Sequence, residues 1–156
     1  MNLFNTLTMT KEPFTPSNND VKMYVCGITP YASAHIGHAM VSIVFDVLRR
    51  YLEHKGFAVT HIQNFTDVDD KMIQAASKSG DTILEIAEKN IASYMMEMDQ
   101  LNILRATSYP RATLEMNSII NLIEGLINKE YAYNIDGDVF FRVKKSIDYG
   151  KLSHRK

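Results

Sequence analysis

The order of apolar patterns in the first 62 residues constrains the fold more than any other feature. Residues 22–26 form a short apolar run with Tyr and Val, which favours a buried strand. From residue 37 to residue 54 the apolar positions recur at helical spacing, and residues 57–62 are again β-branched and aromatic. A strand, a helix and a second strand in this order predict one βαβ unit with parallel strands and a right-handed crossover. We therefore expect an α/β fold.

The composition is typical of a globular chain. The 156 residues are 46% apolar and 22% charged with a net charge of -1, which argues against disorder and against a polybasic nucleic-acid binder. The single cysteine cannot form an internal disulfide and suits a reducing compartment. The first residues lack the pattern of a secretory signal, and no apolar stretch is long enough for a bilayer. We expect a cytoplasmic protein that does not bind membranes.

Capping residues predict the next two helices. Asp67 as N-cap, with Asp70 three residues later, predicts a helix that ends at Gly80. Thr82 and Glu85 form a second capping box, and the apolar residues after it recur every three or four positions. We expect a long amphipathic helix there, with its apolar stripe in the core.

The two ends of the chain are less regular. Residues 1–21 are polar, carry two prolines and are predicted to form an arm and a turn. Pro110 fits the first position of a further helix, and Asp136-Gly137 between two apolar runs predicts a hairpin. Residues 142–156 hold six basic residues against one acidic residue. This basic segment is predicted to form turns. Because no helix or strand is predicted to end it, we expect the chain to be a fragment of a longer protein.

The strongest chemical signal is His35-Ile36-Gly37-His38, between the first strand and the first helix. A helix N-terminus offers unpaired N–H groups and favours bound phosphate. Gly37 lets a flat group approach the backbone, and two imidazoles on one side of the turn can donate to phosphate oxygens. At this spacing, one surface histidine with one core histidine is the commoner arrangement, and a metal pair is a further alternative. The position at the end of a parallel strand favours ligand binding.

Two more features lie at the same predicted edge of the sheet. Cys26 ends the first strand and is a buried structural thiol, a nucleophile or a zinc ligand. A zinc site needs about four ligands, and the chain has no second cysteine. Thr66 and three nearby aspartates follow the second strand, where they either cap a helix or hold a metal or a substrate amine.

Together these segments resemble cysteinyl-tRNA synthetase. The matching segments follow one another in order, at residues 3–8, 23–31, 35–39, 63–71, 101–105 and 109–113. The resemblance covers only the amino-terminal part of that family. It implies a class I synthetase fold, with residues 1–110 as the amino-terminal half of a Rossmann-type catalytic domain. Residues 111–156 would be the helix and hairpin at the start of the connective insertion, so that both parts are incomplete.

The resemblance also implies a function and a set of site residues. The chain would be a fragment of cysteine--tRNA ligase, which activates cysteine with ATP and Mg²⁺ and transfers it to tRNA(Cys). The implied residues are His35 and His38 for catalysis, His35, Gly37 and His38 for ATP, Gly27, Thr29 and Thr66 for cysteine, and Cys26 for Zn²⁺. Cys26 would be one of four zinc ligands. The other three, the lysine loop that closes the ATP site and the anticodon-binding region lie beyond this chain.

Two alternatives stay open. A cysteine ligase of mycothiol synthesis shares the Cys26, His35 to His38 and Asp67 to Asp70 patterns, although Lys71 and residues 109–113 favour the synthetase. The other alternative is a truncated, non-catalytic remnant that binds adenine nucleotides. We expect a monomer that is inactive by itself, because the lysine loop and most zinc ligands are missing.

Overall fold

The computed structural model of the chain describes residues 1–16 and 18–154. The chain divides into two compact units: unit 1 comprises Met1–Pro16 and Met116–Lys156, and unit 2 comprises Ser17–Glu115. Among the residues described, no helix has the length and apolar character needed to cross a membrane. The division at residue 110 that the sequence suggests stays a prediction.

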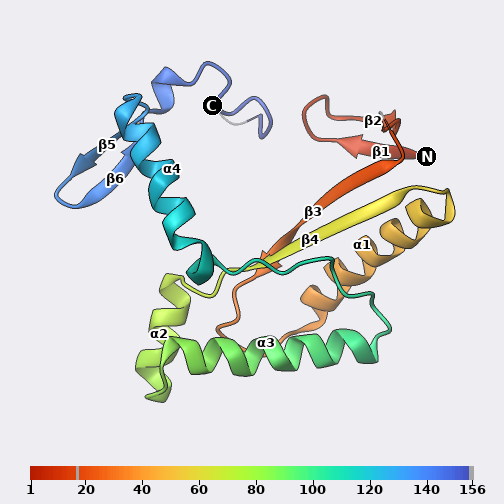
Figure 1. The fold of residues 1–156 in the computed structure, drawn as a ribbon, viewed down its shortest axis with the longest axis horizontal. Helices are drawn as coiled ribbons and strands as arrows, with labels where there is room; N and C mark the ends of the chain where they lie inside the picture. The colour runs from red at the N-terminus through yellow and green to blue at the C-terminus, as the bar shows by residue number, and fades with distance from the viewer. Residues whose placement is uncertain (17, 155–156) are drawn as a thin grey trace. The chain divides into compact units, whose positions relative to one another are not determined.

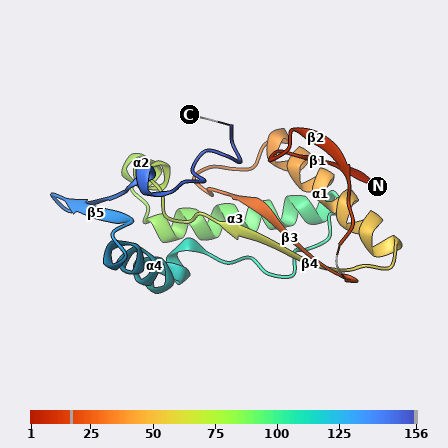
Figure 2. The ribbon, with the colours of Figure 1, turned by 90° about the horizontal axis from the view of Figure 1, so that it is seen from above.

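Unit 2 is built on the predicted order of strand, helix and strand. β3 (Asp20–Ile28) pairs in parallel with β4 (Ala58–Phe65), and α1 (Ile36–His54) connects them. In Figure 1 the two strands run side by side, with α1 and α3 (Ile83–Gln100) on one side of the pair. Figure 2 shows the same strands from a second direction. The expectation of an α/β chain with parallel strands is confirmed.

A third backbone segment lies beside β4 without forming a full strand. Ile62 and Phe65 make parallel bridges to Ser108 and Arg111, and the Phe65 N–H donates to the Pro110 carbonyl oxygen at 2.9 Å. Proline has no N–H with which to continue a ladder, so the segment stays irregular. β4 is therefore paired on both sides.

The predicted helix start at Pro110 is wrong. Pro110 belongs to the extended segment beside β4, a 3-10 turn follows at Ala112–Glu115, and α4 begins only at Met116 (Met116–Asn128). A proline suits the first turn of a helix and also the edge of a sheet, and the pairing with β4 selects the second.

The core of unit 2 lies between the helices and β4. α2 (Asp70–Ser79) ends at Gly80, whose φ of 81° is left-handed, and Thr82 and Glu85 form the predicted capping box at the start of α3. The buried cluster consists of Ala39, Phe65, Met72, Ile86, Ala87, Ile91, Tyr94 and Met98. Five of these residues lie on α3, so the predicted apolar stripe of this helix is confirmed.

The start of α2 differs from the prediction. Its N-cap is Asp69, which accepts the Lys71 N–H at 2.8 Å, and not Asp67. Asp67 is only 2% exposed and accepts both the backbone N–H of Thr113, at 2.9 Å, and its hydroxyl, at 2.6 Å. The two aspartates are alike as caps in sequence, but only Asp67 has donors from a distant segment. It therefore ties the end of β4 to the 3-10 turn.

The described part of unit 1 contains two hairpins and one α-helix. The polar residues predicted as an arm form an antiparallel hairpin instead, made of β1 (Asn2–Asn5) and β2 (Thr10–Pro13). The predicted second hairpin is confirmed as β5 (Ala132–Ile135) and β6 (Asp138–Phe141). Asp136 and Gly137, with φ of 53° and 97°, provide the left-handed backbone that a tight turn needs. The basic segment continues in a 3-10 turn (Val143–Lys145) and further turns; its residues 155 and 156 lie outside the described residues.

Candidate functional site

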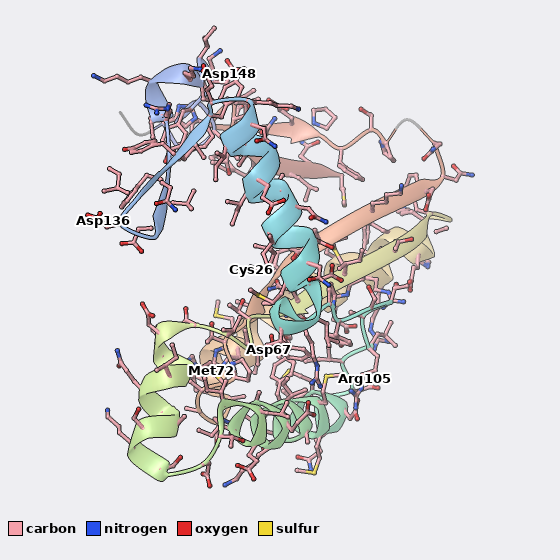
Figure 3. The ribbon with its side chains drawn as sticks, turned by 60° about the vertical axis from the view of Figure 1, so that its left-hand side comes forward. Cys26, Asp67, Met72, Arg105, Asp136 and Asp148 are labelled. Atoms are coloured by element: carbon pink, nitrogen blue, oxygen red, sulfur yellow. The ribbon has the colours of Figure 1, made fainter. Side chains whose placement is uncertain are left out.

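The predicted site residues lie where β3 and β4 end. Cys26 and Gly27 belong to the last residues of β3, and Thr66 directly follows β4. The Thr66 N–H donates to the Ile28 carbonyl oxygen at 2.9 Å, which joins the two strand ends. Figure 3 shows the labelled Cys26 and Asp67 near these ends. α/β folds bind ligands at the carboxyl ends of their parallel strands, and the predicted site residues lie at this edge of the sheet.

Gly27 is required by the close approach of β3 and β4. Its N–H donates to Asn64 Oδ1 at 3.0 Å, and a Cβ on Gly27 would lie 1.6 Å from the Asn64 carbonyl oxygen. The strand register shifts here, between Val25 and Ile28. Any other residue at 27 would force the strands apart. The part of Gly27 in binding cysteine stays a prediction.

Asn64 is a residue that the sequence did not single out. Its side chain accepts from Gly27 through Oδ1 and donates from Nδ2 to Thr66 Oγ1 at 3.2 Å, so one amide fixes two predicted cysteine-binding residues. Thr29, the third, accepts the Tyr31 N–H at 2.9 Å through its carbonyl oxygen in the loop after β3. In the sequence, Asn64 follows the predicted second strand at residues 57–62 and lies within the matching segment 63–71, but nothing there marked it as a residue that positions its neighbours.

Cys26 has an exposed free thiol, so the alternative of a buried structural cysteine is wrong. Its Sγ lies 3.7 Å from the Gly27 carbonyl oxygen. Within residues 1–16 and 18–154, no three side chains of His, Cys, Asp or Glu come together closely enough to hold a metal ion. Cys26 is thus a single candidate ligand, and the donors present do not make a zinc site by themselves.

His35 and His38 together cap the N-terminus of α1. His35 is the N-cap, and its Nδ1 accepts the Gly37 N–H at 3.1 Å. The Nδ1 of His38 accepts the backbone N–H of His35 at 3.2 Å, which closes a reciprocal capping box. The two rings stack with their centroids 3.9 Å apart and their planes 23° apart. The structure thus brings both predicted catalytic residues into direct contact.

Gly37 makes room for this arrangement. A Cβ on Gly37 would lie 2.9 Å from Cε1 and 3.0 Å from Nδ1 of His35. Burial lowers the pKa of the His38 imidazole from its ordinary 6.5, and the neighbouring His35 lowers it further. The neutral form of His38 is therefore favoured near pH 7.

His61 is a second residue that sequence reasoning missed. It lies on β4, is 6% exposed, and neither ring nitrogen has a hydrogen-bond partner among the residues described. It lines a cavity of about 10 Å³ with Ser42 and Tyr94, whose hydroxyl groups bond to each other at 2.9 Å. Burial lowers the pKa of His61, Arg49 lowers it further and Asp46 opposes both. A histidine in an alternating strand pattern gives no sign of such isolation.

The fold and the site define the class of the protein. A crystal structure of Mycobacterium tuberculosis methionyl-tRNA synthetase bound by methionyl-adenylate superimposes with a TM-score of 0.64 and 17% sequence identity, over 78% of this chain and 29% of that chain. The fold is that of class I aminoacyl-tRNA synthetase catalytic domains. Residues 13–156 match the family of tRNA synthetases class I (C) catalytic domain, and the chain belongs to this family.

Curated relatives agree with this family. The chain is 58% identical to cysteine--tRNA ligase of Caldicellulosiruptor saccharolyticus over 156 residues, which is 99% of this chain and 34% of that protein. It is 54% identical to cysteine--tRNA ligase of Dehalococcoides mccartyi, again over 99% of this chain and 34% of that protein. The chain thus spans about a third of the length of these relatives. The resemblance to cysteinyl-tRNA synthetase is confirmed.

Proposed function

We propose that the chain forms the Rossmann-type nucleotide-binding part of a cysteine--tRNA ligase, with MgATP bound by His35, Gly37 and His38. The observation that carries this proposal is the capped pair of stacked imidazoles at the start of α1, next to the ends of two parallel strands, in a chain of this family. Parallel strand ends and helix N-termini are where α/β folds bind nucleotides.

The electrostatics of the first turn of α1 support an anionic ligand. The positive end of the helix dipole faces the His35–His38 turn, and this turn, which lies wholly within the described residues, carries no acidic side chain. Two imidazole rings add N–H donors at the same place. A polyphosphate meets favourable partners here and no competing carboxylate from the turn itself.

The amino-acid side of the site is proposed next to it. Gly27, Thr29 and Thr66 would bind cysteine, and Asn64 holds the first and the last of these in place. Cys26 would be one of four zinc ligands, with the other three outside this chain. Transfer to tRNA(Cys), the monomeric state and the cytoplasmic location belong to the same proposal.

Nucleotide binding is tested by titrating the chain with MgATP and following heat or backbone amide shifts. We expect weak binding that is lost in the double variant His35→Ala/His38→Ala. His54→Ala, in the last turn of the same helix, is the control and should bind as the unchanged chain does. Equal binding by the double variant and the control would contradict the proposed site.

Activation is tested by cysteine-dependent exchange of pyrophosphate into ATP. A site without its closing lysine contacts loses several kcal/mol of transition-state stabilisation, so we expect exchange roughly three or more decades slower than in a full-length ligase. Exchange near the rate of a full-length ligase would show that these 156 residues make a self-sufficient site.

A further inference from the structure

We propose that His35 and His38 meet the nucleotide phosphates as neutral imidazoles that carry their proton on Nε2, and that two backbone N–H groups fix this state. The proposal rests on the nucleotide site proposed above and deepens it by assigning the protonation state of its two donors. The juxtaposition that carries it is the reciprocal cap, in which each ring accepts a backbone N–H through Nδ1.

The cap determines which nitrogen carries the proton. A neutral imidazole has one N–H and one acceptor nitrogen. The Gly37 N–H lies 3.1 Å from Nδ1 of His35, and the His35 N–H lies 3.2 Å from Nδ1 of His38. A backbone N–H can only donate, so both Nδ1 atoms must be acceptors. The proton of each neutral ring is therefore on Nε2.

The same contacts disfavour the imidazolium form. A protonated ring carries N–H on both nitrogens, so its Nδ1–H would face a backbone N–H and the cap would be lost. With centroids 3.9 Å apart, two charged rings would also repel each other. The partly buried position of His38 acts in the same direction, because burial lowers the pKa of this imidazole.

The arrangement prepares two donors before any ligand binds. In each ring the capping bond fixes Nδ1, which sets the tautomer and the ring plane, and Nε2–H remains for a ligand. The stacking places the two rings side by side. Two adjacent neutral N–H donors match two non-bridging oxygens of a polyphosphate, and no reorganisation is needed when the ligand arrives. Glycine at position 37 is needed for this arrangement of the two rings, because a side chain there would collide with the His35 ring.

The tautomers are measured by long-range proton–nitrogen NMR of the uniformly ¹⁵N-labelled chain at pH 7.5, with and without saturating MgATP. Each histidine is assigned by its single substitution. We expect His35 and His38 to show an unprotonated Nδ1 and a protonated Nε2 in both states. A protonated Nδ1 on either ring, as the other tautomer or as the cation, would overturn the inference.

A matched pair of variants separates capping from ligand binding. His35→Asn keeps a short side-chain acceptor, a preferred N-cap, but has no donor at the Nε2 position. His35→Gln reaches that position with an amide N–H but loses the short acceptor. We expect His35→Asn to melt as the unchanged chain does and to bind MgATP roughly tenfold more weakly, since a hydrogen bond to a charged group is lost. We expect His35→Gln to melt earlier and to keep part of the affinity.

The outcomes distinguish this inference from the proposed function. Full MgATP affinity in His35→Asn would show that Nε2–H of His35 does not meet the phosphates and would overturn the inference, while the nucleotide site itself would stand. An unchanged chain whose histidine signals do not respond to MgATP would overturn the nucleotide site and, with it, the functional half of the inference.

Discussion

The two units of the chain bury their apolar residues very differently. In unit 2 eight buried side chains form one cluster around α3 and β4. In the described part of unit 1, Ala132 is the only buried apolar residue, and α4 buries none although it is rich in Ile and Leu. Apolar content alone therefore does not make a core. In unit 2, β4 has a partner on each side, and helices can pack against the sheet that results. The single helix and two hairpins of unit 1 offer a smaller surface for such packing.

This difference decides where a precise site can lie. All residues of the candidate site belong to unit 2 and lie on, or directly beside, elements that contribute to its core: Ala39 lies on α1 and Phe65 ends β4. Side chains on packed elements are held more exactly than side chains on an exposed hairpin. Changes in the core of unit 2 should therefore alter stability and the site together, whereas the loss of an exposed side chain in unit 1 should alter neither.

The largest expected effect comes from the core. Met72 is completely buried, so Met72→Ala should lower the free energy of unfolding by about 2–5 kcal/mol through lost contacts and a cavity. Urea unfolding followed by circular dichroism measures it. The control is Leu122→Ala on α4, where the side chain is 65% exposed and the expected change is within about 0.5 kcal/mol. Similar losses in both variants would remove the contrast between the units.

Two glycine substitutions sharpen the comparison. Gly27→Ala should cost about 1–3 kcal/mol, because its Cβ would collide with the Asn64 carbonyl group. Gly125→Ala, within α4, should instead stabilise by about 0.5–1 kcal/mol, since a Cβ there meets no described atom within 4 Å and alanine favours the helix. Thermal melts of the two variants test this. Opposite signs are the expected result, and a neutral Gly27→Ala would contradict the close strand contact.

A smaller effect is expected at the start of α3. Thr82→Ala removes the hydroxyl that accepts the Glu85 N–H at 3.2 Å, which should cost about 1 kcal/mol. Ser118→Ala, on the exposed surface of α4, is the matched control and should leave the melting temperature almost unchanged. If Thr82→Ala melts like its control, the capping box contributes nothing measurable to unit 2.

The smallest effect is confined to mildly acidic pH. The pKa of His61 is lowered in the folded chain by burial, so the unfolded chain binds a proton more readily. The contribution of His61 is fully present above its ordinary pKa of 6.5 and is lost as the pH falls from there through the lowered pKa. His38 is shifted in the same direction. Stability should therefore decline on acidification through this range.

The variant His61→Phe measures how much His61 contributes to this loss of stability at acidic pH, because phenylalanine keeps a ring but does not titrate. Melting temperatures between pH 7.5 and pH 5 should fall less steeply in this variant than in the unchanged chain. The control is Leu122→Ala, an exposed position without a titrating group in unit 1, which should leave the slope as it is. An identical slope in His61→Phe would show that the buried imidazole is not the cause.

Local patterns in the sequence determined much of unit 2. The alternation of strand, helix and strand depends on residues close in the chain, as do the Gly80 stop, the Thr82–Glu85 box and the Asp136-Gly137 turn, and the structure contains all of them. The motif around His35 and His38 was located for the same reason, because a helix start and its caps are set within a few residues.

The tertiary structure decided what depends on distant partners. Asp67 and Asp69 are equivalent helix caps in sequence, and only the approach of Thr113, 46 residues later, buries Asp67 and leaves the cap to Asp69. Pro110 became an edge residue because β4 pairs with its segment. The need for glycine at 27 comes from Asn64. His61 is isolated because residues of α1 and α3, such as Phe45 and Met98, line the same cavity and leave its ring nitrogens without partners among the residues described. Short-range patterns fix the elements, while contacts across the chain choose among the roles that each residue type allows.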